Sequence, residues 1–397
     1  MPSRRRLISA ILLGSLGPSL SALAQVTANT AATASPKAEP KAGPNTPAKP
    51  ASRTPDEAAV PTRFGDGPKT VALLIPRREG AFVRVADCVV AGVRAAHSRD
   101  GDGVAVEVIE ADSDPAELGR LFADLRERGV ALALGPLTRD GVNSLLTLDR
   151  PPGVPTLTLN LPDGDPPAPP QTAFFGVSIE AESRLAAVMA FEQAHGAIGK
   201  RAPRAMAVGA PSRLAQRSAK AFRDEWAQRG GEIDEPIEFD PKRSSQAFRE
   251  AIKDENPDVV FLALNPEQAR SARRSIGSRV RLWSSSMASI GQTKLLRLPE
   301  LDGLRLFDMP WQVEPDHPAV MAYPKAPNNY TVEMQRLYAL GIDAFRVGRQ
   351  IMAGSASFEL DGVTGRLNYD PTVRPRVERV PVLAEYRAGM PVAVRAR

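Results

Sequence analysis

Hydrophobic positions along this chain follow two alternating periods from residue 70 onward. Val71 to Ile75 form a continuous apolar run, which is typical of a strand buried on both faces of a parallel sheet. After a polar turn at residues 76–80, apolar residues recur every three or four positions between Phe82 and Val93, which predicts an amphipathic helix. A buried strand that leads through a short turn into a helix is the first unit of a parallel α/β sheet.

The same strand and helix patterns continue in two consecutive series. In the first series we expect strands at residues 104–109, 130–134, 155–159 and 174–179, and helices at 115–128, 140–148 and 181–195. In the second series we expect strands at 204–208, 232–239, 258–264, 280–283 and 304–307, and helices at 214–229, 244–254 and 266–276. Two successive series of this kind predict two α/β lobes, each with a mainly parallel sheet flanked by helices.

The pattern changes toward the end of the chain. Residues 330–340 and 342–353 predict two helices separated at Gly341. Residues 358–367 predict a hairpin with glycine at its turn, and residues 380–397 alternate apolar and polar side chains as strands do.

The first 24 residues predict an export signal. Arg4 to Arg6 form a basic start, residues 7–23 form an apolar stretch interrupted by Pro18, and residues 22–24 read Ala-Leu-Ala, a cleavage site. We expect a cleaved signal peptide, Sec export to the periplasm and, as the alternative route, twin-arginine export. Because no cysteine lies near the cleavage site, we expect no lipid anchor. No later apolar run is long enough to span a membrane.

Residues 25–67 predict a disordered linker. They consist mainly of Ala, Pro, Thr and Lys, so they bury too little apolar surface to fold by themselves. The linker is either a tether that positions the folded part or a passive spacer.

Composition narrows the function classes. The formal net charge is +5, but lysines and arginines alternate with acidic residues along the predicted helices, and aromatic residues make up only 5% of the chain. Single-stranded nucleic acid needs basic and aromatic residues together on one surface. We therefore expect no nucleic-acid partner.

The residues that usually carry catalysis are sparse. The three histidines, His97, His195 and His317, are far apart and match no metal-ligand spacing. The single cysteine, Cys88, lies at an apolar position of the first helix, which is typical of a core residue. No phosphate loop, dinucleotide fingerprint or nucleophile elbow is present. We expect a protein that is not an enzyme and has no cofactor and no metal.

The strand ends are the candidate binding residues. Ligands of open parallel sheets bind outside the carboxyl ends of the strands, so facing sheets would bring these ends to one cleft. Their hydroxyl groups and helix-start amides would suit a small polar or anionic ligand, although the same residues also serve as helix caps. The candidates are Arg77, Arg78, Phe82, Pro136, Leu137, Thr138 and Asn160 in the first lobe, and Ser212, Arg213, Asn265, Ser284 and Ser285 in the second.

Motifs in the last third of the chain resemble one family. Asp308-Met309-Pro310-Trp311 follows a short strand, Gly341 to Phe345 read G-I-D-A-F, residues 360–367 read L-D-G-V-T-G-R-L, and residues 385–392 read E-Y-R-A-G-M-P-V. Together they resemble the penicillin-binding protein activator family, whose fold is that of type I periplasmic binding proteins. The resemblance covers residues 69–394. Asp343 stands where related amino-acid-binding proteins have an acidic residue near the cleft, so it joins the candidate ligand-binding residues.

The resemblance implies a fold and a function. It implies a two-lobed type I periplasmic-binding-protein-like fold, with residues 68–180 and 308–354 in lobe 1 and residues 181–307 and 355–397 in lobe 2. It implies a non-enzymatic periplasmic regulator of peptidoglycan synthesis, whose partner is a peptidoglycan synthase of the penicillin-binding protein class. The alternative is a soluble periplasmic solute-binding protein for a small polar ligand, such as an amino acid or a muropeptide.

Overall fold

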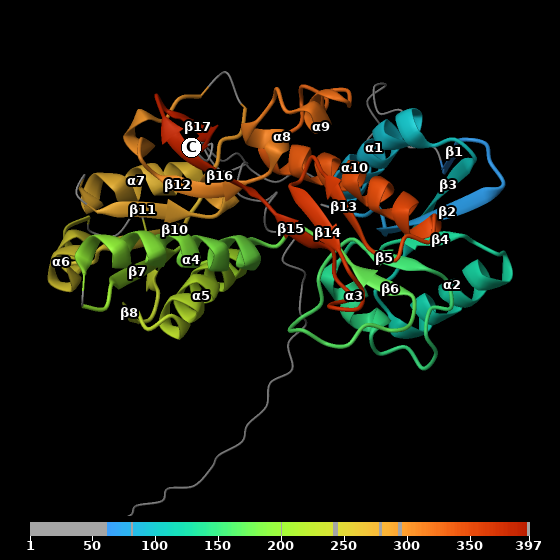
Figure 1. Ribbon diagram of the computed structural model, residues 1–397, viewed down its shortest axis with the longest axis horizontal. Helices are drawn as coiled ribbons and strands as arrows, with labels where there is room; N and C mark the ends of the chain where they lie inside the picture. The colour runs from blue at the N-terminus through green and yellow to red at the C-terminus, as the bar shows by residue number, and fades with distance from the viewer. Residues whose placement is uncertain are drawn as a thin grey trace, which may run out of the picture.

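Two α/β lobes lie side by side in the computed structural model, which describes residues 62–80, 82–199, 201–240, 245–277, 280–292 and 296–394 (Figure 1). Each lobe has its own sheet, and a third, smaller sheet lies where the lobes meet. The predicted fold class, two mainly parallel sheets flanked by helices, is confirmed. The predicted signal peptide lies outside the described residues, as does most of the predicted linker.

The sheet of lobe 1 has six strands in the order β1-β3-β2-β4-β5-β6. All neighbouring pairs are parallel except β1 with β3. The strands are β1 (Arg63–Phe64), β2 (Lys69–Pro76), β3 (Val104–Ala111), β4 (Leu132–Leu134), β5 (Thr156–Thr158) and β6 (Thr172–Phe174). The helices of this lobe are α1 (Phe82–Asp100), α2 (Pro115–Glu127), α3 (Arg139–Leu145) and α10 (Val332–Met352).

Alternate residues of β2 supply the two faces of the lobe 1 core. Val71, Leu73 and Ile75 join a cluster with α1 and α10, whereas Ala72 and Leu74 join a second cluster with α2 and α3. All five side chains are at most 1% exposed. A strand with helices on both faces has no solvent-facing positions, which explains the continuous apolar run in the sequence.

The sheet of lobe 2 has eight strands in the order β17-β16-β12-β11-β10-β7-β8, and β9 also pairs with β7. These strands are β7 (Arg204–Gly209), β8 (Glu232–Ile233), β9 (Ile237–Glu238), β10 (Val259–Ala263), β11 (Arg281–Ser284), β12 (Arg305–Asp308), β16 (Val382–Arg387) and β17 (Met390–Ala393). The helices are α4 (Ile179–Ile198), α5 (Arg213–Gln228), α6 (Ser245–Glu255) and α7 (Pro266–Ile276), with short turns η2 (Ser286–Ala288) and η3 (Pro299–Leu301).

The chain passes between the lobes three times. It enters lobe 2 between β6 and α4, and it returns from β12 through α8 (Pro310–Val313) and α9 (Pro318–Met321) to α10. It then forms the antiparallel sheet β13 (Phe358–Asp361), β14 (Arg366–Tyr369) and β15 (Glu378–Val380), and it crosses to β16 in lobe 2. Figure 1 shows β14 and β15 in the middle of the molecule, next to both lobes.

Among the sequence-based expectations that differ from the structure, three concern how the elements are joined and packed. Gly341 does not separate two helices, because α10 runs unbroken from Val332 to Met352. The predicted linker ends too late, since Arg63 and Phe64 already pair with β3. Residues of β13 and β14 pack on the lobe 1 cluster, whereas only β16 and β17 join the lobe 2 sheet, so the segment 355–397 does not belong to lobe 2 as a whole. Local patterns predict elements but not the core against which each one packs.

Candidate functional site between the lobes

The candidate residues at the strand ends of lobe 1 form hydrogen bonds within their own lobe. Thr138 begins α3, where its hydroxyl accepts a hydrogen bond from the Gly141 amide at 3.1 Å, as helix caps do. The Asn160 amide donates to the Leu137 carbonyl at 3.1 Å. Pro136, which follows a cis peptide bond, and Leu137 are buried. These residues lie together, as the sequence indicates, but their polar groups bind neighbouring backbone.

Two candidate residues at the strand ends of lobe 2 are also helix caps. Ser212 caps α5 through the Ala215 amide, and Asn265 caps α7 in a reciprocal arrangement with Gln268. Arg213, the first residue of α5, is exposed. Capping therefore accounts for the polar atoms of both helix starts.

Two serines at the end of β11 are fully buried. The Ser284 hydroxyl donates to the Leu262 carbonyl at 2.6 Å, which fastens β11 to β10. Ser285 is equally inaccessible, and its hydroxyl has no hydrogen-bond partner among the described residues. Neither hydroxyl reaches a solvent-filled space.

The arginines of the first turn pair with carboxylates of lobe 1. Arg77 lies 2.9 Å from Asp112 and 2.8 Å from Glu117, and its side chain is 53% exposed. Arg78 lies 2.6 Å from Asp87, on α1. Phe82, the first residue of α1, is half-buried. Nothing in these contacts joins the two arginines to the strand ends of lobe 2.

A carboxylate at the start of α4 joins the lobes near those strand ends. Glu180 lies 3.2 Å from Arg139 of α3 and 2.9 Å from Arg217 of α5. The Arg217 Nε has no hydrogen bond, so its contact is an ion pair only. Burial alone would raise the pKa of the Glu180 carboxyl, but Arg139 and Arg217 outweigh that effect and hold the pKa below its usual value.

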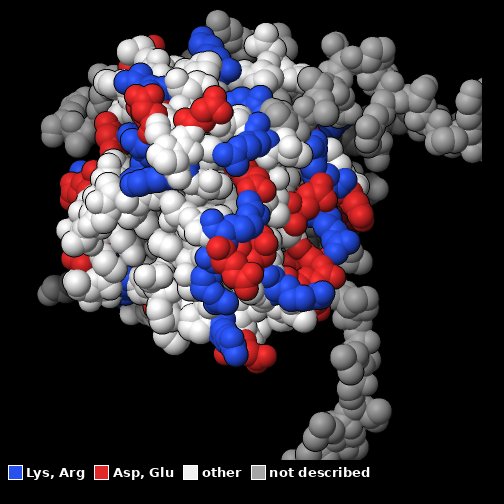
Figure 2. All heavy atoms as spheres, turned by 90° about the vertical axis from the view of Figure 1, so that its right-hand side faces the viewer, with Lys and Arg blue, Asp and Glu red and all other residues white. Residues whose placement is uncertain are grey.

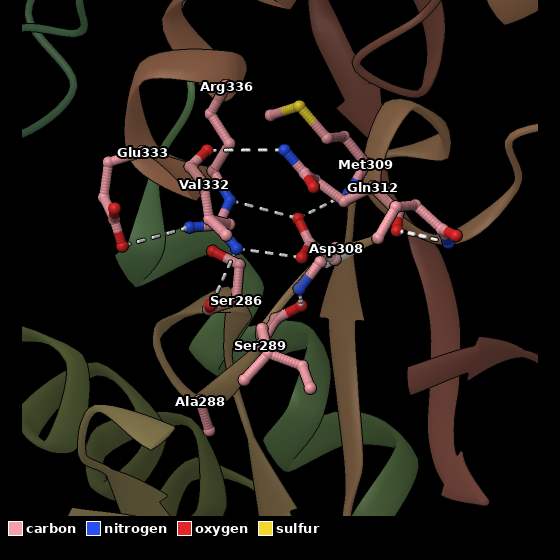
Figure 3. A network of polar contacts seen from close by, with 12 residues as sticks. Ser286, Ala288, Ser289, Asp308, Met309, Gln312, Val332, Glu333 and Arg336 are labelled. Atoms are coloured by element: carbon pink, nitrogen blue, oxygen red, sulfur yellow. Dashed lines mark hydrogen bonds and ion pairs between the residues drawn. The ribbon is translucent and has the colours of Figure 1, made fainter. Parts of the chain in front are cut away.

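Asp308, the first residue of the Asp-Met-Pro-Trp motif, forms a second connection. It ends β12 in lobe 2, is 0% exposed, and binds Arg336 of α10 through two contacts of 2.9 and 3.2 Å (Figure 3). Arg336 also donates to the Ser286 carbonyl at 3.0 Å. Burial would lower the pKa of Arg336, but Asp308 raises it above its usual value, so the guanidinium stays charged.

A third connection is buried even more completely. Glu182 of α4 and Arg379 of β15 are 1% and 6% exposed and lie 2.6 Å apart. Glu182 also accepts a hydrogen bond from the Ser286 amide, and Arg379 donates to the Thr364 carbonyl at 2.9 Å. The pair thus connects α4 and η2 of lobe 2 to the small third sheet.

Asp343 organises the turn between β13 and β14 rather than an open cleft. Its carboxylate accepts hydrogen bonds from the Val363 amide, the Thr364 amide and the Thr364 hydroxyl at 3.1, 2.8 and 2.6 Å. Arg346 adds an ion pair at 3.0 Å. Burial raises the pKa of the Asp343 carboxyl, against the opposing effect of Arg346 and these donors. The two sequence motifs at residues 341–345 and 360–367 are therefore one packed unit.

The other motif residues are structural as well. The Trp311 ring packs against Tyr338 with centroids 5.3 Å apart, and its amide donates to the Val363 carbonyl. The Tyr386 hydroxyl donates to the Ala288 carbonyl at 2.7 Å and accepts from the Ile290 amide. These contacts hold β13–β15, α8 and η2 in fixed relative positions.

Sequence reasoning missed most of the charged residues at this site. Glu180 and Glu182 look like the ordinary acidic first turn of a helix, and Arg336 and Arg379 look like surface residues. One available signal was the position of Asp308, a carboxylate directly after a buried strand. A carboxylate at that place requires a cation or several donors.

The site holds no arrangement suited to catalysis or to a metal within the described part of the chain. No group of three or more His, Cys, Asp or Glu side chains there could hold a metal ion. Burial raises the pKa of the Cys88 thiol to about 11, which leaves it protonated and unreactive. Two cavities lie away from the strand ends, one in lobe 2 and one beside β13 and β14.

Charged side chains on the lobe 1 surface are mixed. Figure 2 shows lysines and arginines next to aspartates and glutamates on that face, without a large patch of one sign. Arg128, for example, binds both Asp124 and Glu107. Among the described residues, no helix has the length and apolar composition required to cross a bilayer.

Two α/β lobes connected by three crossings define a protein of the periplasmic-binding-protein-like class. A family model described as "LppC putative lipoprotein" matches residues 41–244 and 243–389. The chain therefore belongs to the LppC family, and the resemblance to penicillin-binding protein activators is confirmed.

Relatives with known names agree with this membership. The penicillin-binding protein activator LpoA of Pasteurella multocida is 26% identical over 330 residues, which cover 80% of this chain and 54% of that protein. The chain thus spans about half the length of the curated relatives that it matches.

Two solved structures are similar over most of the described chain. One is described as a "putative branched-chain amino acid ABC transporter" from Chromobacterium violaceum, with 31% identity, a TM-score of 0.64, and coverage of 80% of this chain and 100% of that one. The other is the C-domain of LpoA from Haemophilus influenzae, described as a regulator of PBP1A, with 21% identity, a TM-score of 0.64, and coverage of 82% and 100%.

Family membership corrects the expected localisation. The absence of a cysteine near residue 24 predicted a periplasmic protein without a lipid anchor. That prediction is wrong, because the matched family is one of lipoproteins and points to an anchor. The prediction depended on one short stretch of sequence around the predicted cleavage site, whereas the family match extends over most of the chain.

Proposed function

We propose that this protein regulates peptidoglycan synthesis in the periplasm through contact with a penicillin-binding protein and without chemistry of its own. The observation that carries the proposal is the similarity to proteins named penicillin-binding protein activators over about 80% of the chain. The similarity spans the whole of a solved C-domain that is described as a regulator of PBP1A.

The packing between the lobes supports a scaffold. Asp308 with Arg336, Glu182 with Arg379, and Glu180 with Arg139 are three ion pairs that connect lobe 2 to lobe 1 or to the third sheet. Their polar groups are engaged with each other and not with an open space. A two-lobed protein whose inner surfaces bind each other has its outer surface left for a partner.

A synthesis assay tests the proposal. The length and amount of glycan strands made by the cognate synthase would be measured with and without this protein. We expect stimulation that saturates with the concentration of the protein, together with co-purification of the two. A synthase whose rate is unchanged at saturating concentration, with no complex detected, would refute the proposal.

The alternative is a solute-binding protein for a small polar ligand. It is supported by the 31% identity to a solved structure described as a "putative branched-chain amino acid ABC transporter". A ligand that binds only the folded state stabilises it by mass action, by about 2.7 kcal/mol when its concentration is 100 times its Kd. The melting temperature rises as a result. A thermal-shift screen of amino acids and muropeptides tests it, and no shift across the set would exclude this function for those ligands.

A further inference from the structure

A small cavity lies at the edge of the lobe 2 sheet, away from the site between the lobes. Its volume is about 140 Å³, and the residues that line it include Gln193, Arg281, Trp283, Arg305 and Glu385. Arg281 and Arg305 are the first residues of β11 and β12. The cavity therefore lies at the amino ends of two inner strands of the sheet, and Ser284 and Asp308 lie at the opposite, carboxyl ends of the same strands.

The positive charge around this cavity exceeds the negative charge. Arg305 lies 3.2 Å from Glu385, and Arg387 shares that carboxylate at 3.5 Å. Arg281 forms no ion pair or hydrogen bond with the described residues. Asp258 is close enough for an electrostatic interaction with Arg281, but its two carboxylate oxygens already bind Arg201 at 2.5 and 2.9 Å. One guanidinium of the cavity is therefore available to an anion.

Two residues that line the cavity also carry buried polar atoms without a hydrogen-bond partner among the described residues. Trp283 is 1% exposed, and its indole Nε1 has no acceptor among the described residues. The side-chain oxygen of Gln193 is buried and has no donor in the same part of the chain. A buried polar atom without a partner costs about 1–3 kcal/mol. The other tryptophan of the lobe 2 core differs, because the Nε1 of Trp226 donates to the Glu232 carbonyl at 3.2 Å.

We propose that this cavity binds a small carboxylate that carries a hydroxyl or ammonium group next to the carboxyl group. The carboxylate pairs with Arg281 and accepts the hydrogen bond of the Trp283 indole, and the neighbouring donor satisfies the Gln193 oxygen. The cavity is small, at about 140 Å³. The size fits a three-carbon acid and excludes drug-sized ligands, which need about 300 Å³ or more.

Lactate, alanine and propionate are suitable probes, because propionate has the carboxylate without the neighbouring donor. The chain has three tryptophans, so their indole N–H signals can be followed individually by NMR in the whole protein. The signal that is missing from the spectrum of Trp283→Phe belongs to Trp283. We expect lactate or alanine to shift the Trp283 signal in a saturable way, with Kd in the millimolar range. Propionate should bind at least threefold more weakly, and sodium chloride at equal ionic strength should shift nothing.

Arg281→Gln should weaken the binding of lactate at least tenfold, and Arg281→Lys should give an intermediate value because lysine keeps the charge but not the fork of donors. The matched control is Arg274→Gln, an exposed arginine on α7 that does not line the cavity, and it should bind as the wild type does. The proposal is overturned if about 50 mM lactate and alanine produce no saturable shift of Trp283. Unchanged affinity in a folded Arg281→Gln protein would also overturn it, and the Arg281→Lys protein serves if Arg281→Gln does not fold.

Discussion

At the scale of single residues, the charged groups between the lobes matter because they are buried. A buried ion pair is strongly destabilised when one partner is removed, since the remaining charge is left without compensation. Glu182 and Arg379 meet this condition, at 1% and 6% exposure.

We expect Arg379→Met to lower the free energy of unfolding by about 3–5 kcal/mol, because Glu182 would stay buried without its cation. Urea denaturation would measure this change, and the double variant with Glu182→Gln should recover part of the loss. Arg374→Met is the control, since its side chain is 59% exposed and should change stability by about 0.5 kcal/mol or less. A single variant within 1 kcal/mol of the wild type would contradict the assignment.

Glu180 gives a pH dependence. Its pKa is lowered in the folded protein, so its stabilising contribution is present above the unfolded pKa of about 4.3 and is lost as the pH falls through the folded value. We expect Glu180→Gln to lower the free energy of unfolding by about 1–3 kcal/mol at pH 7 and by progressively less below about pH 4.

Denaturation at pH 7, 5, 4 and 3 would test this dependence. Glu192→Gln is the control on the same helix, because the Glu192 side chain is 66% exposed and its difference from the wild type should stay small at every pH. A difference for Glu180→Gln that does not change with pH would show that the carboxylate charge is not the cause.

At the scale of elements, the contact between α1 and α10 explains why Gly341 does not break a helix. A side-chain carbon added at Gly341 would lie 2.3 Å from the Val89 carbonyl oxygen, and one added at Gly92 would lie 2.0 Å from the Tyr338 carbonyl oxygen. The two helices thus approach each other closely enough that neither position has room for a side chain. The glycines are placed for packing rather than for a turn.

We expect Gly341→Ala to destabilise the protein by about 2–3 kcal/mol, although alanine favours a helix by about 1 kcal/mol relative to glycine. The atoms that it would meet belong to the backbone of α1 and cannot rotate away. Gly119→Ala in α2 is the control, because its nearest contact would be an ordinary 3.7 Å to Leu148, and it should be neutral or stabilising. Thermal unfolding of both variants would show whether each one is more or less stable than the wild type. A Gly341→Ala protein that is more stable than the wild type would disprove the close approach.

At the scale of the whole molecule, three chain crossings and the ion pairs between the lobes predict that the described part of the chain unfolds as one unit. Arg336 is central to this coupling, because it joins α10 to Asp308 and to the Ser286 carbonyl of lobe 2. Cooperative unfolding of two lobes requires that their interface be comparable in strength to the lobes themselves.

We expect a single calorimetric transition for the wild type and two separated transitions for Arg336→Gln, in which Asp308 is left buried without a cation. Glu333→Gln is the control, since Glu333 lies 4.0 Å from Arg336 and is 51% exposed. One transition of unchanged shape and temperature in Arg336→Gln would show that Arg336 is not required to couple the lobes.

The order and kind of most elements can be predicted from the sequence alone. The continuous apolar run at Val71–Ile75 and the helical spacing after Phe82 depend only on neighbouring residues, and the structure has a strand and a helix there. The sequence also located the strand ends, including Thr138 and Asn265, which begin helices. The motifs at residues 308–311 and 360–367 were among those that indicated the family, and the family model confirms it.

The sequence does not show which charged residues are buried and paired, because that depends on the tertiary structure. The fold buries Glu182, Asp308 and Asp343, and it brings them to Arg379, Arg336 and Arg346. Glu182 and Arg379 are 197 residues apart, and nothing in their own surroundings marks them as partners. Whether a charge is exposed or buried depends on how the lobes pack, and burial is what gives an ion pair its energetic weight.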